Sequence, residues 1–222
     1  MFDFLRLFFP PRCIFCSTLL EFDKNIEICD SCYEEIPFSE PGYLPSSKED
    51  KISCNGIICA CSYKGIVKEA LKRYKFKGKA SYCRAFAKLL TDKVKTETGN
   101  KKFDIIVSVP LHRKRERLRG YNQSELISRL LSRQTGIKNY PNILSRVRDT
   151  SGQSLITSKK DRYENIKNAF SVTDPKIVEG KSVILVDDIV TTGFTISECA
   201  RVLMEAGASE VIAAVIASGR SF

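Results

Sequence analysis

The chain has 222 residues, of which 43% are hydrophobic, so it can form one medium-sized domain with a core and one small additional module. No apolar run reaches the length of a membrane-spanning helix, which argues against an integral membrane protein. Residues 1–50 carry 4 Lys or Arg and 10 Asp or Glu, a balance of −6, whereas residues 51–222 carry 32 and 16, a balance of +16. A basic body of this kind favours a polyanionic partner such as nucleic acid, although a basic surface also serves solubility alone.

The first eleven residues are mostly apolar and aromatic, but they are too short and too interrupted for a signal peptide. They also lack a small-residue cleavage site. We expect this arm to pack on the module that follows it, and docking to a partner or a membrane is the alternative interpretation.

Two Cys-x2-Cys pairs separated by twelve residues come next: Cys13, Cys16, Cys29 and Cys32. One tetrahedral ion collects four thiolates by this spacing, so we predict a structural Zn²⁺. The alternatives are four buried thiols or disulfides, which the lack of an export signal argues against. A module of about forty residues has little core, so the metal would supply much of its folding free energy. We place a zinc-finger module at residues 1–45, with residues 37–45 as its linker, and a second domain at residues 46–222.

Residues 66–77 predict a basic helix, and between Lys64 and Arg84 there are eight Lys or Arg and one acid. Aromatic and basic side chains alternate near its end: Tyr74, Lys75, Phe76 and Lys77. The rings could stack on bases while the cations meet phosphates, which predicts binding of single-stranded DNA. The alternative is a solvated helix whose aromatic side chains enter the core. A second helical pattern covers residues 82–95.

Residues 103–109 predict a strand buried on both faces, and a further helix is expected to reach about residue 134. Between these elements lies a basic stretch with Arg113, Lys114, Arg115, Arg117 and Arg119. Cations placed after a strand end converge on one spot, so a pyrophosphate site is predicted there. Its predicted ligands are Lys75, Arg115, Arg117 and Arg119. The predicted DNA surface combines residues 74–77 with Arg113, Lys114 and Arg115.

Residues 144–170 are polar and only weakly periodic. A segment of this length in a compact domain usually moves or takes part in function. We interpret it as a candidate lid over the phosphate site.

Residues 183–186 are four consecutive apolar β-formers, which predict a strand buried on both faces. Asp187 and Asp188 come where that strand is expected to end. Thr195 and Glu198 have the spacing of a capping box, so a helix is expected to open there and to reach about residue 206. Residues 210–217 predict the next strand.

This order of strand, turn and helix suits a sugar phosphate. Backbone N–H groups, hydroxyls and a helix N-terminus all favour a phosphate monoester, and the predicted ligands are Thr191, Thr192, Gly193, Phe194 and Thr195. The paired carboxylates of Asp187 and Asp188 cannot also bind phosphate, so they must meet ribose hydroxyls or a divalent metal such as Mg²⁺. The alternative is a buried strand that ends in a polar turn, with the two aspartates as caps.

Residues 183–195 resemble the phosphoribosyl-diphosphate (PRPP) motif of type I phosphoribosyltransferases. The resemblance implies that Asp187 and Asp188, the candidate catalytic residues, contact the ribose hydroxyls, and that residues 191–195 wrap the 5-phosphate. It also implies an α/β fold, with a mostly parallel sheet and flanking helices. Here a small zinc-finger module precedes that domain.

The whole chain is similar to the ComF family, competence-associated proteins with a zinc finger ahead of a phosphoribosyltransferase domain. The motifs behind this resemblance are the four cysteines and residues 75–78, 109–112, 119–123, 146–153, 162–165 and 186–188. Two departures, Arg113 for a frequent proline and Lys79 for an acid, each add a cation. The resemblance implies a cytoplasmic protein of natural transformation, held near the inner membrane through partners at most. It would work on incoming single-stranded DNA beside a helicase-like partner.

The resemblance implies no known reaction, because the type I fold hosts transferases and also non-catalytic regulators. Three interpretations stay open. The first is a DNA-processing protein whose site binds PRPP, a nucleotide or a DNA 5′-phosphate. The second is a phosphoribosyltransferase that releases pyrophosphate, with Mg²⁺ neutralising the leaving group. The third is a non-enzymatic adaptor that links a helicase to DNA.

Overall fold

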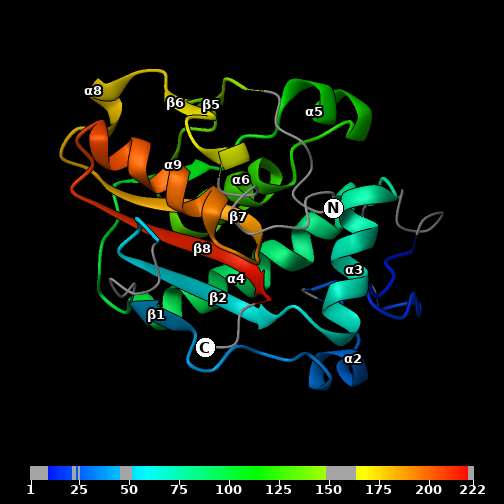
Figure 1. Ribbon diagram of the computed structural model, residues 1–222. Coiled ribbons are helices and arrows are strands. Elements are labelled where there is room, and N and C mark those ends of the chain that lie inside the picture. Colours follow the sequence, from blue (N-terminus) through cyan, green and yellow to red (C-terminus); the bar gives the residue numbers. More distant parts are fainter. Residues whose placement is uncertain (1–9, 22–23, 25, 46–51, 149–163, 220–222) are drawn as a thin grey trace.

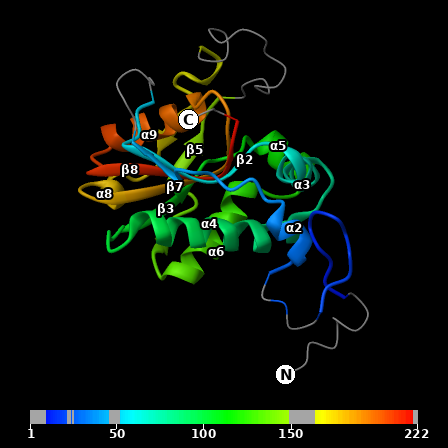
Figure 2. The ribbon, with the colours of Figure 1, turned by 90° about the horizontal axis from the view of Figure 1, so that it is seen from below.

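A computed structural model describes residues 10–21, 24, 26–45, 52–148 and 164–219. Its centre is a sheet of six strands in the order β1-β2-β8-β7-β3-β4, with helices on both faces (Figure 2). The strands are β1 (Tyr43–Pro45), β2 (Gly56–Ser62), β3 (Ile105–Ser108), β4 (Lys138–Asn139), β7 (Ser182–Val190) and β8 (Glu210–Ser218). All neighbours are parallel except β1 and β2. The predicted α/β fold with a mostly parallel sheet is confirmed.

The described helices lie on both sides of the sheet, as expected where the central strands are buried on both faces (Figures 1 and 2). They are α2 (Asp30–Glu34), α3 (Gly65–Phe76), α4 (Cys83–Thr98), α5 (Arg113–Arg119), α6 (Gln123–Thr135), α8 (Pro175–Val178) and α9 (Phe194–Glu205), with a 3-10 turn at Ala80–Tyr82. Helices α4 and α6 cover one face, and α9 covers the other (Figure 2). The helices and strands therefore follow the predicted order.

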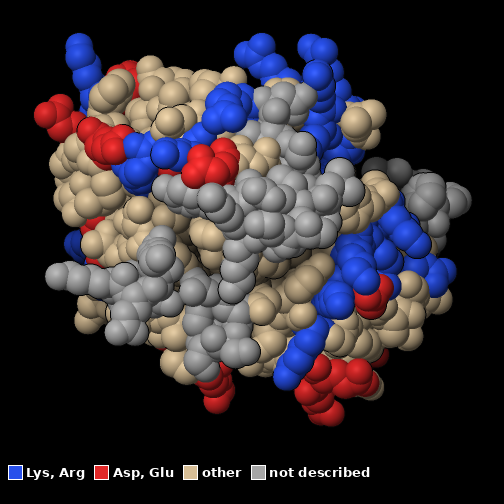
Figure 3. All heavy atoms as spheres, viewed as in Figure 1, with Lys and Arg blue, Asp and Glu red and all other residues tan. Residues whose placement is uncertain are grey.

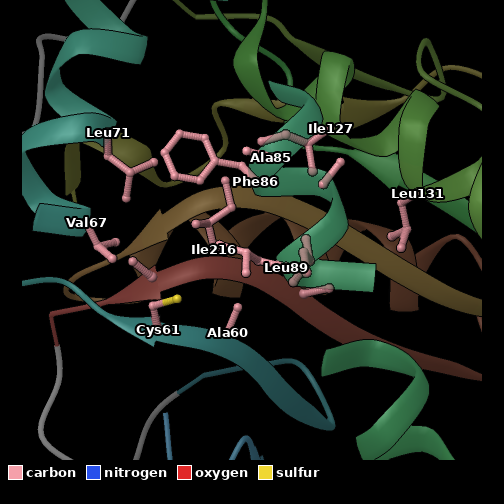
Figure 4. Close-up of a cluster of buried hydrophobic side chains, with 14 of the residues drawn as sticks. Ala60, Cys61, Val67, Leu71, Ala85, Phe86, Leu89, Ile127, Leu131 and Ile216 are labelled. Atoms are coloured by element: carbon pink, nitrogen blue, oxygen red, sulfur yellow. The ribbon is translucent and has the colours of Figure 1, made fainter. Parts of the chain in front are cut away.

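Each face of the sheet has its own core. On the face covered by α3, α4 and α6, Leu71, Phe86 and Ile127 pack toward Ile216 of β8 (Figure 4). On the opposite face, buried side chains of β7 and β8 pack against α9. Successive residues of β7 thus alternate between two apolar layers, which is why residues 183–186 carry no polar side chain.

The basic stretch after β3 forms the short helix α5, which we did not predict as a separate element. Gly120, in the left-handed region at φ 83°, ends α5. Helix α6 then begins at the cap residue Asn122, whose side chain accepts from the backbone N–H of Ser124 at 3.1 Å. The amide of Asn122 also donates to the carbonyl of Val109 at 3.2 Å. This bond holds the first turn of α6 beside the carboxyl end of β3.

The four-cysteine module packs directly on the domain. Ile14 and Phe15 are buried in the same core cluster as Leu71 and Phe86. Residues 37–45, predicted as a linker, are part of the sheet edge, because the backbone of Ser39 bonds to that of Ala60 and β1 pairs with β2. The linker prediction is therefore wrong. The boundary between residues 45 and 46 stays a prediction, since residues 46–51 lie outside the described residues.

A second, two-stranded sheet pairs β5 (Leu144–Arg146) with β6 (Phe170–Val172) in antiparallel fashion. The lid predicted for residues 144–170 falls largely on residues 149–163, which lie outside the described residues, as does most of the apolar arm. In the part of the chain that is described, no helix is long and apolar enough to cross a membrane.

Candidate functional site

The two aspartates lie within β7, which continues to Val190 and does not end at the acid pair as predicted. Hydrogen bonding between β7 and β8 extends to Val190 and Ser218, so the backbone stays extended beyond the carboxylates. Successive side chains of a strand point to opposite faces, which places Asp188 on the side of α3 and α6. Asp188 is 3% exposed, and Asp187 is partly exposed.

Both carboxylate oxygens of Asp188 meet donors from other elements. The ammonium Nζ of Lys75, at the end of α3, lies 3.0 Å from Oδ1. The amide Nε2 of Gln123, the first residue of α6, donates to Oδ2 at 2.9 Å. A buried carboxylate needs such partners, because an unpaired charge in a low-dielectric interior is unfavourable. We call Asp187, Asp188, Lys75, Gln123 and Ser124 the acid-pair site.

Asp187 shares this environment. The hydroxyl of Ser124 donates to its Oδ1 at 2.8 Å, and the backbone N–H of Asp188 donates to the same oxygen at 2.9 Å. Burial, with the neighbouring charge of Asp188, raises the pKa of Asp187 to about 7, against the opposing effects of Lys75 and Ser124. Asp187 can therefore exchange a proton near neutral pH.

The turn after β7 leads directly into α9. Gly193 is the cap residue of α9 and lies in the left-handed region at φ 81°, where a residue with a side chain would be strained. The predicted capping box of Thr195 and Glu198 is wrong, since α9 begins at Phe194 and Glu198 lies inside it. Glu198 accepts instead from the backbone of Asn168 at 2.7 Å and pairs with Arg201. The turn and the backbone N–H groups of the first turn of α9 remain suited to a phosphate.

Arg119, the last residue of α5, interacts electrostatically with Asp188. Its guanidinium lies over the ring of Phe76 at 5.4 Å, and Phe76 is 74% exposed. Burial lowers the pKa of Arg119, whereas the charge of Asp188 raises it. Among the described residues, no hydrogen bond or ion pair joins Arg117 to either aspartate. The structure thus brings Lys75 and Arg119 to the predicted site and leaves Arg117 exposed on α5.

Tyr74 is fully buried, so the prediction that it stacks on nucleic-acid bases is wrong. Its ring packs against Phe86 at 5.6 Å between centroids, and its hydroxyl donates to the backbone carbonyl of Gln123 at 2.9 Å. Tyr121 packs on Tyr74 from the other direction, with centroids 5.6 Å apart. These rings join α3 to the start of α6 and hold Lys75 and Gln123 beside Asp188.

The other cations between Lys64 and Arg84 divide into two groups. Arg73 donates through Nη2 to the carbonyls of Ile14, at 2.8 Å, and Phe15, at 3.0 Å, and Arg84 pairs with Glu27, so these two cations hold the four-cysteine module. Others, including Lys77, are exposed. Figure 3 shows basic side chains along the flank where α3 lies and above α5, with acidic side chains below, near α2.

The four cysteines form one cluster whose sulfur atoms all lie within 4.8 Å of one another. Sulfur atoms around a tetrahedral zinc ion, with Zn–S bonds of about 2.3 Å, would be about 3.8 Å apart. The Sγ atoms of Cys16 and Cys29 lie 3.6 Å apart. Hydrogen bonds from Thr18 lower the pKa of Cys16 to about 6, which favours its thiolate, whereas burial raises the pKa of Cys32. The cluster fits a zinc ion, as the spacing predicted.

Gln123 and Ser124 are the site residues that sequence reasoning missed. Gln123 belongs to a family-like motif, yet we assigned it no role, and Ser124 was not singled out. The order of β7 beside β3 supplies the missing information, because a helix that starts after β3 begins at the edge where β7 presents its aspartates. Asn122, a strong cap residue after a predicted strand, marks that helix start in the sequence.

Comparison with known proteins shows which family the chain resembles. Residues 125–221 match the phosphoribosyl transferase domain family. Competence protein F of Haemophilus influenzae is 33% identical over 220 residues, which cover 92% of this chain and 95% of that protein. DNA utilization protein YhgH of Escherichia coli K12 is 31% identical over 204 residues, covering 90% and 86%. Competence protein ComFC of Bacillus subtilis is 33% identical over 147 residues, covering 66% and 57%.

Solved structures align over a smaller part of the chain. An allosteric regulatory enzyme of purine biosynthesis aligns with a TM-score of 0.40 and 26% identity, over 59% of this chain and 25% of that one. A Thermus thermophilus protein, TT1426, aligns with a TM-score of 0.38 and 13% identity, over 61% and 74%. Family membership therefore rests on the sequence relatives, whose alignments cover most of this chain.

Proposed function

The chain belongs to the family of competence protein F, DNA utilization protein YhgH and ComFC, and we propose that it works on DNA taken up by the cell. In this proposal it acts in the cytoplasm during natural transformation. It binds a ribose phosphate, such as PRPP, at the acid-pair site and single-stranded DNA along α3 and α5. The names of the relatives support the role in DNA uptake, and a helicase-like partner is expected from the family resemblance alone.

The observation that carries the ribose-phosphate proposal is the junction of β7 and α9. Two carboxylates lie near the end of β7, and the next turn presents a glycine in the left-handed region followed by a helix N-terminus. The hydroxyl of Thr192, within this turn, is buried and lacks a hydrogen-bond partner among the described residues. Mg²⁺ would enter with the ligand, because carboxylate and phosphate oxygens are the ligands it prefers.

The ribose-phosphate proposal is tested by the thermal stability of the folded chain. Ligand that binds only the native state raises the melting temperature, so ribose 5-phosphate with Mg²⁺ should raise it in the wild type. Asp187→Asn combined with Asp188→Asn should abolish the shift. An exposed acid on α4, changed by Asp92→Asn, is the matched control. An equal shift in the double variant would place the ligand elsewhere.

The DNA proposal is supported by exposed cations at one end of the molecule. Lys77, Arg113 and Lys114 are exposed and Arg115 is partly exposed, and the exposed ring of Phe76 at the end of α3 contacts Arg119 of the same helix α5. An aromatic ring among cations can stack on a base while the cations meet phosphates, without sequence preference. Tyr74 and Lys75 are left out of this surface, because the one is buried and the other pairs with Asp188.

Titration of oligo-dT across salt concentrations tests this surface. Combining Lys77→Ala, Arg113→Ala and Lys114→Ala should weaken binding and lower the slope of log affinity against log salt by about 2, since fewer counterions are released. The matched control combines Lys95→Ala, Lys102→Ala and Lys181→Ala, exposed cations that precede β3 and β7 at the opposite edge of the sheet. If both triple variants lose affinity equally, binding is non-specific charge attraction and the surface is not where we place it.

A transferase reaction is the second candidate function, favoured by the match of residues 125–221 to the phosphoribosyl transferase domain. Its reaction would transfer the phosphoribosyl group of PRPP to an acceptor and release pyrophosphate. Pyrophosphate release from PRPP, assayed with and without single-stranded DNA or free nucleobases, distinguishes it. Release that depends on an added acceptor would establish the transferase. Binding of PRPP without any release would leave the first function.

A further inference from the structure

Of the eight buried side-chain polar atoms that lack a hydrogen-bond partner among the described residues, four belong to residues at or after the carboxyl ends of β3 and β7. They are the hydroxyls of Ser108 and Thr192, Nη1 of Arg119 and Oε1 of Gln123. These atoms come from four separate elements, and two of those elements also contact or surround the acid pair. A buried polar atom without a partner is unfavourable, and folded proteins keep such groups mainly where a ligand, an ion or a water completes them. Gln123 is the member whose required partner can be specified.

The orientation of the Gln123 amide follows from its contact with Asp188. A carboxylate oxygen accepts hydrogen bonds, so the NH₂ group of the amide must face Oδ2, at 2.9 Å. This leaves Oε1, an acceptor on the same amide carbon, directed away from Oδ2 yet close beside the acid pair. Gln123 is only 6% exposed, so bulk water does not supply the missing donor freely.

The charges nearby limit what that donor can be. Lys75 already places an ammonium 3.0 Å from Asp188, and Arg119 interacts electrostatically with the same carboxylate. Mg²⁺ that enters with the ligand would be held by carboxylate and phosphate oxygens, so the donor that remains for the amide oxygen Oε1 is a neutral O–H group. A sugar hydroxyl is such a group, and it also suits the two carboxylates.

We infer that Gln123 determines specificity at the acid-pair site by accepting a hydrogen bond from the ribose 2-hydroxyl through Oε1. This inference rests on the proposed ribose-phosphate function and sharpens it. A 2-deoxyribose offers one donor fewer, and leaves a buried acceptor unpaired, so the site selects ribo over 2-deoxyribo ligands. The 5′-phosphate end of a DNA strand is then the weaker ligand. DNA and the sugar phosphate bind at different places on the chain.

Calorimetric titration of the full chain with ribose 5-phosphate and with 2-deoxyribose 5-phosphate, both with Mg²⁺, tests the inference. The wild type should bind the ribo ligand at least tenfold more tightly. Gln123→Met should reduce this preference severalfold, with its larger loss on the ribo ligand. A 5′-phosphorylated oligo-dT should not displace ribose 5-phosphate from the wild type.

Controls separate a change of specificity from a change of fold. Thr91→Val removes another buried, unpaired hydroxyl, on α4, and should leave the preference unchanged. If Gln123→Met does not fold, Gln123→Asn withdraws the same oxygen with a smaller change of chemistry. Equal binding of both sugars by the wild type would overturn the inference and leave the proposed ligand site standing. Binding of neither sugar would overturn both, and an unchanged preference in the folded Gln123 variants would show that the aspartates alone select the sugar.

Discussion

The four-cysteine module and the acid-pair site each collect side chains around a small volume, but they take them from very different distances along the chain. The module draws its four sulfur atoms from residues 13–32, as two short local pairs. The acid-pair site joins Lys75 of α3, Gln123 of α6 and Asp188 of β7. The difference shows that a metal centre can be formed by residues that are close together in the sequence. The acid-pair site, in contrast, exists only after the sheet has positioned its helices.

The two regions are also physically connected. Arg73 and Lys75 lie two residues apart on α3, and Arg73 bonds to the carbonyls of Ile14 and Phe15 in the module. One helix therefore contacts the four-cysteine module at one side chain and the acid pair at another. The experiments below ask whether each region is held by its own contacts, from the largest expected effect to the smallest.

Removal of two metal ligands should have the largest effect. Cys29→Ser combined with Cys32→Ser should reduce bound zinc from one ion per chain to none, because binding free energies of about 10–16 kcal/mol hold structural zinc with four ligands. Metal analysis and limited proteolysis of the module measure the result. Cys83→Ser, a cysteine outside the cluster, should retain the metal. If zinc stays bound in the double variant, the four cysteines do not form the metal site, and the contrast between a local and an assembled site is contradicted.

Lys75→Met tests the assembled site. It leaves the buried carboxylate of Asp188 without its cation, and we expect a loss of about 3 kcal/mol in the free energy of unfolding. Urea denaturation measures this loss. Lys77→Met, two residues on and exposed, should change stability by less than about 0.5 kcal/mol. Adding Asp188→Asn to Lys75→Met should recover part of the loss, and equal effects of the two lysine variants would contradict the ion pair.

Arg73→Met tests the connection between the regions. Two carbonyls of the module lose their donor, so stability should fall by about 2 kcal/mol while the metal stays bound. For a chain of this size the melting temperature should drop by roughly 4–8 °C. Lys72→Met, whose exposed partner Glu69 belongs to the same helix, is the matched control. A loss of zinc in Arg73→Met would mean that the module depends on α3 to hold its ion.

The smallest expected effect is a pH dependence of ligand binding. Because the pKa of Asp187 is raised to about 7, this group is largely protonated below neutral pH and loses the negative charge that makes it a strong acceptor for ribose hydroxyls. Affinity for ribose 5-phosphate should therefore rise about tenfold between pH 6 and pH 8. The folded chain also keeps a proton that the unfolded chain loses between about pH 4 and pH 7, so this group lowers stability as pH rises through that window.

Calorimetry across this pH range checks the prediction, with Asp187→Asn as the control. The ligand phosphate titrates near pH 6, and its contribution remains in the variant. The difference between the two profiles isolates Asp187. Identical profiles would contradict a carboxylate that ionises near neutral pH in the ligand site.

Several features were predictable because they depend on neighbouring residues. The four cysteines, the buried strand at residues 183–186 and the strand at residues 210–217 all follow from local spacing or composition. The burial of Tyr74 was also available, since Val67, Ala70, Leu71 and Tyr74 form one helical stripe at the spacing of a core-facing side. We misjudged it by giving weight to the alternation of aromatic and basic residues.

Other features were decided by the tertiary structure. A capping box between Thr195 and Glu198 is a valid local pattern, but Glu198 instead meets Asn168 and Arg201, and Gly193 begins the helix. The composition of residues 37–45 predicts a linker, but in the structure their last three residues form β1 and pair with the edge of β2. In both cases contacts with residues distant in the sequence replace the structure that the local pattern predicts.

The acid pair shows the limit most clearly. The sequence by itself determined that two carboxylates follow a buried strand and precede a turn suited to phosphate. Only the tertiary structure decided that Lys75, and not exposed Lys77, meets Asp188, and that Gln123 completes the pair. There are two physical reasons. Two residues along a helix rotate the direction of a side chain about the helix axis by about 200°. The strand order of the sheet, with β7 beside β3, brings the start of α6 to the carboxylates.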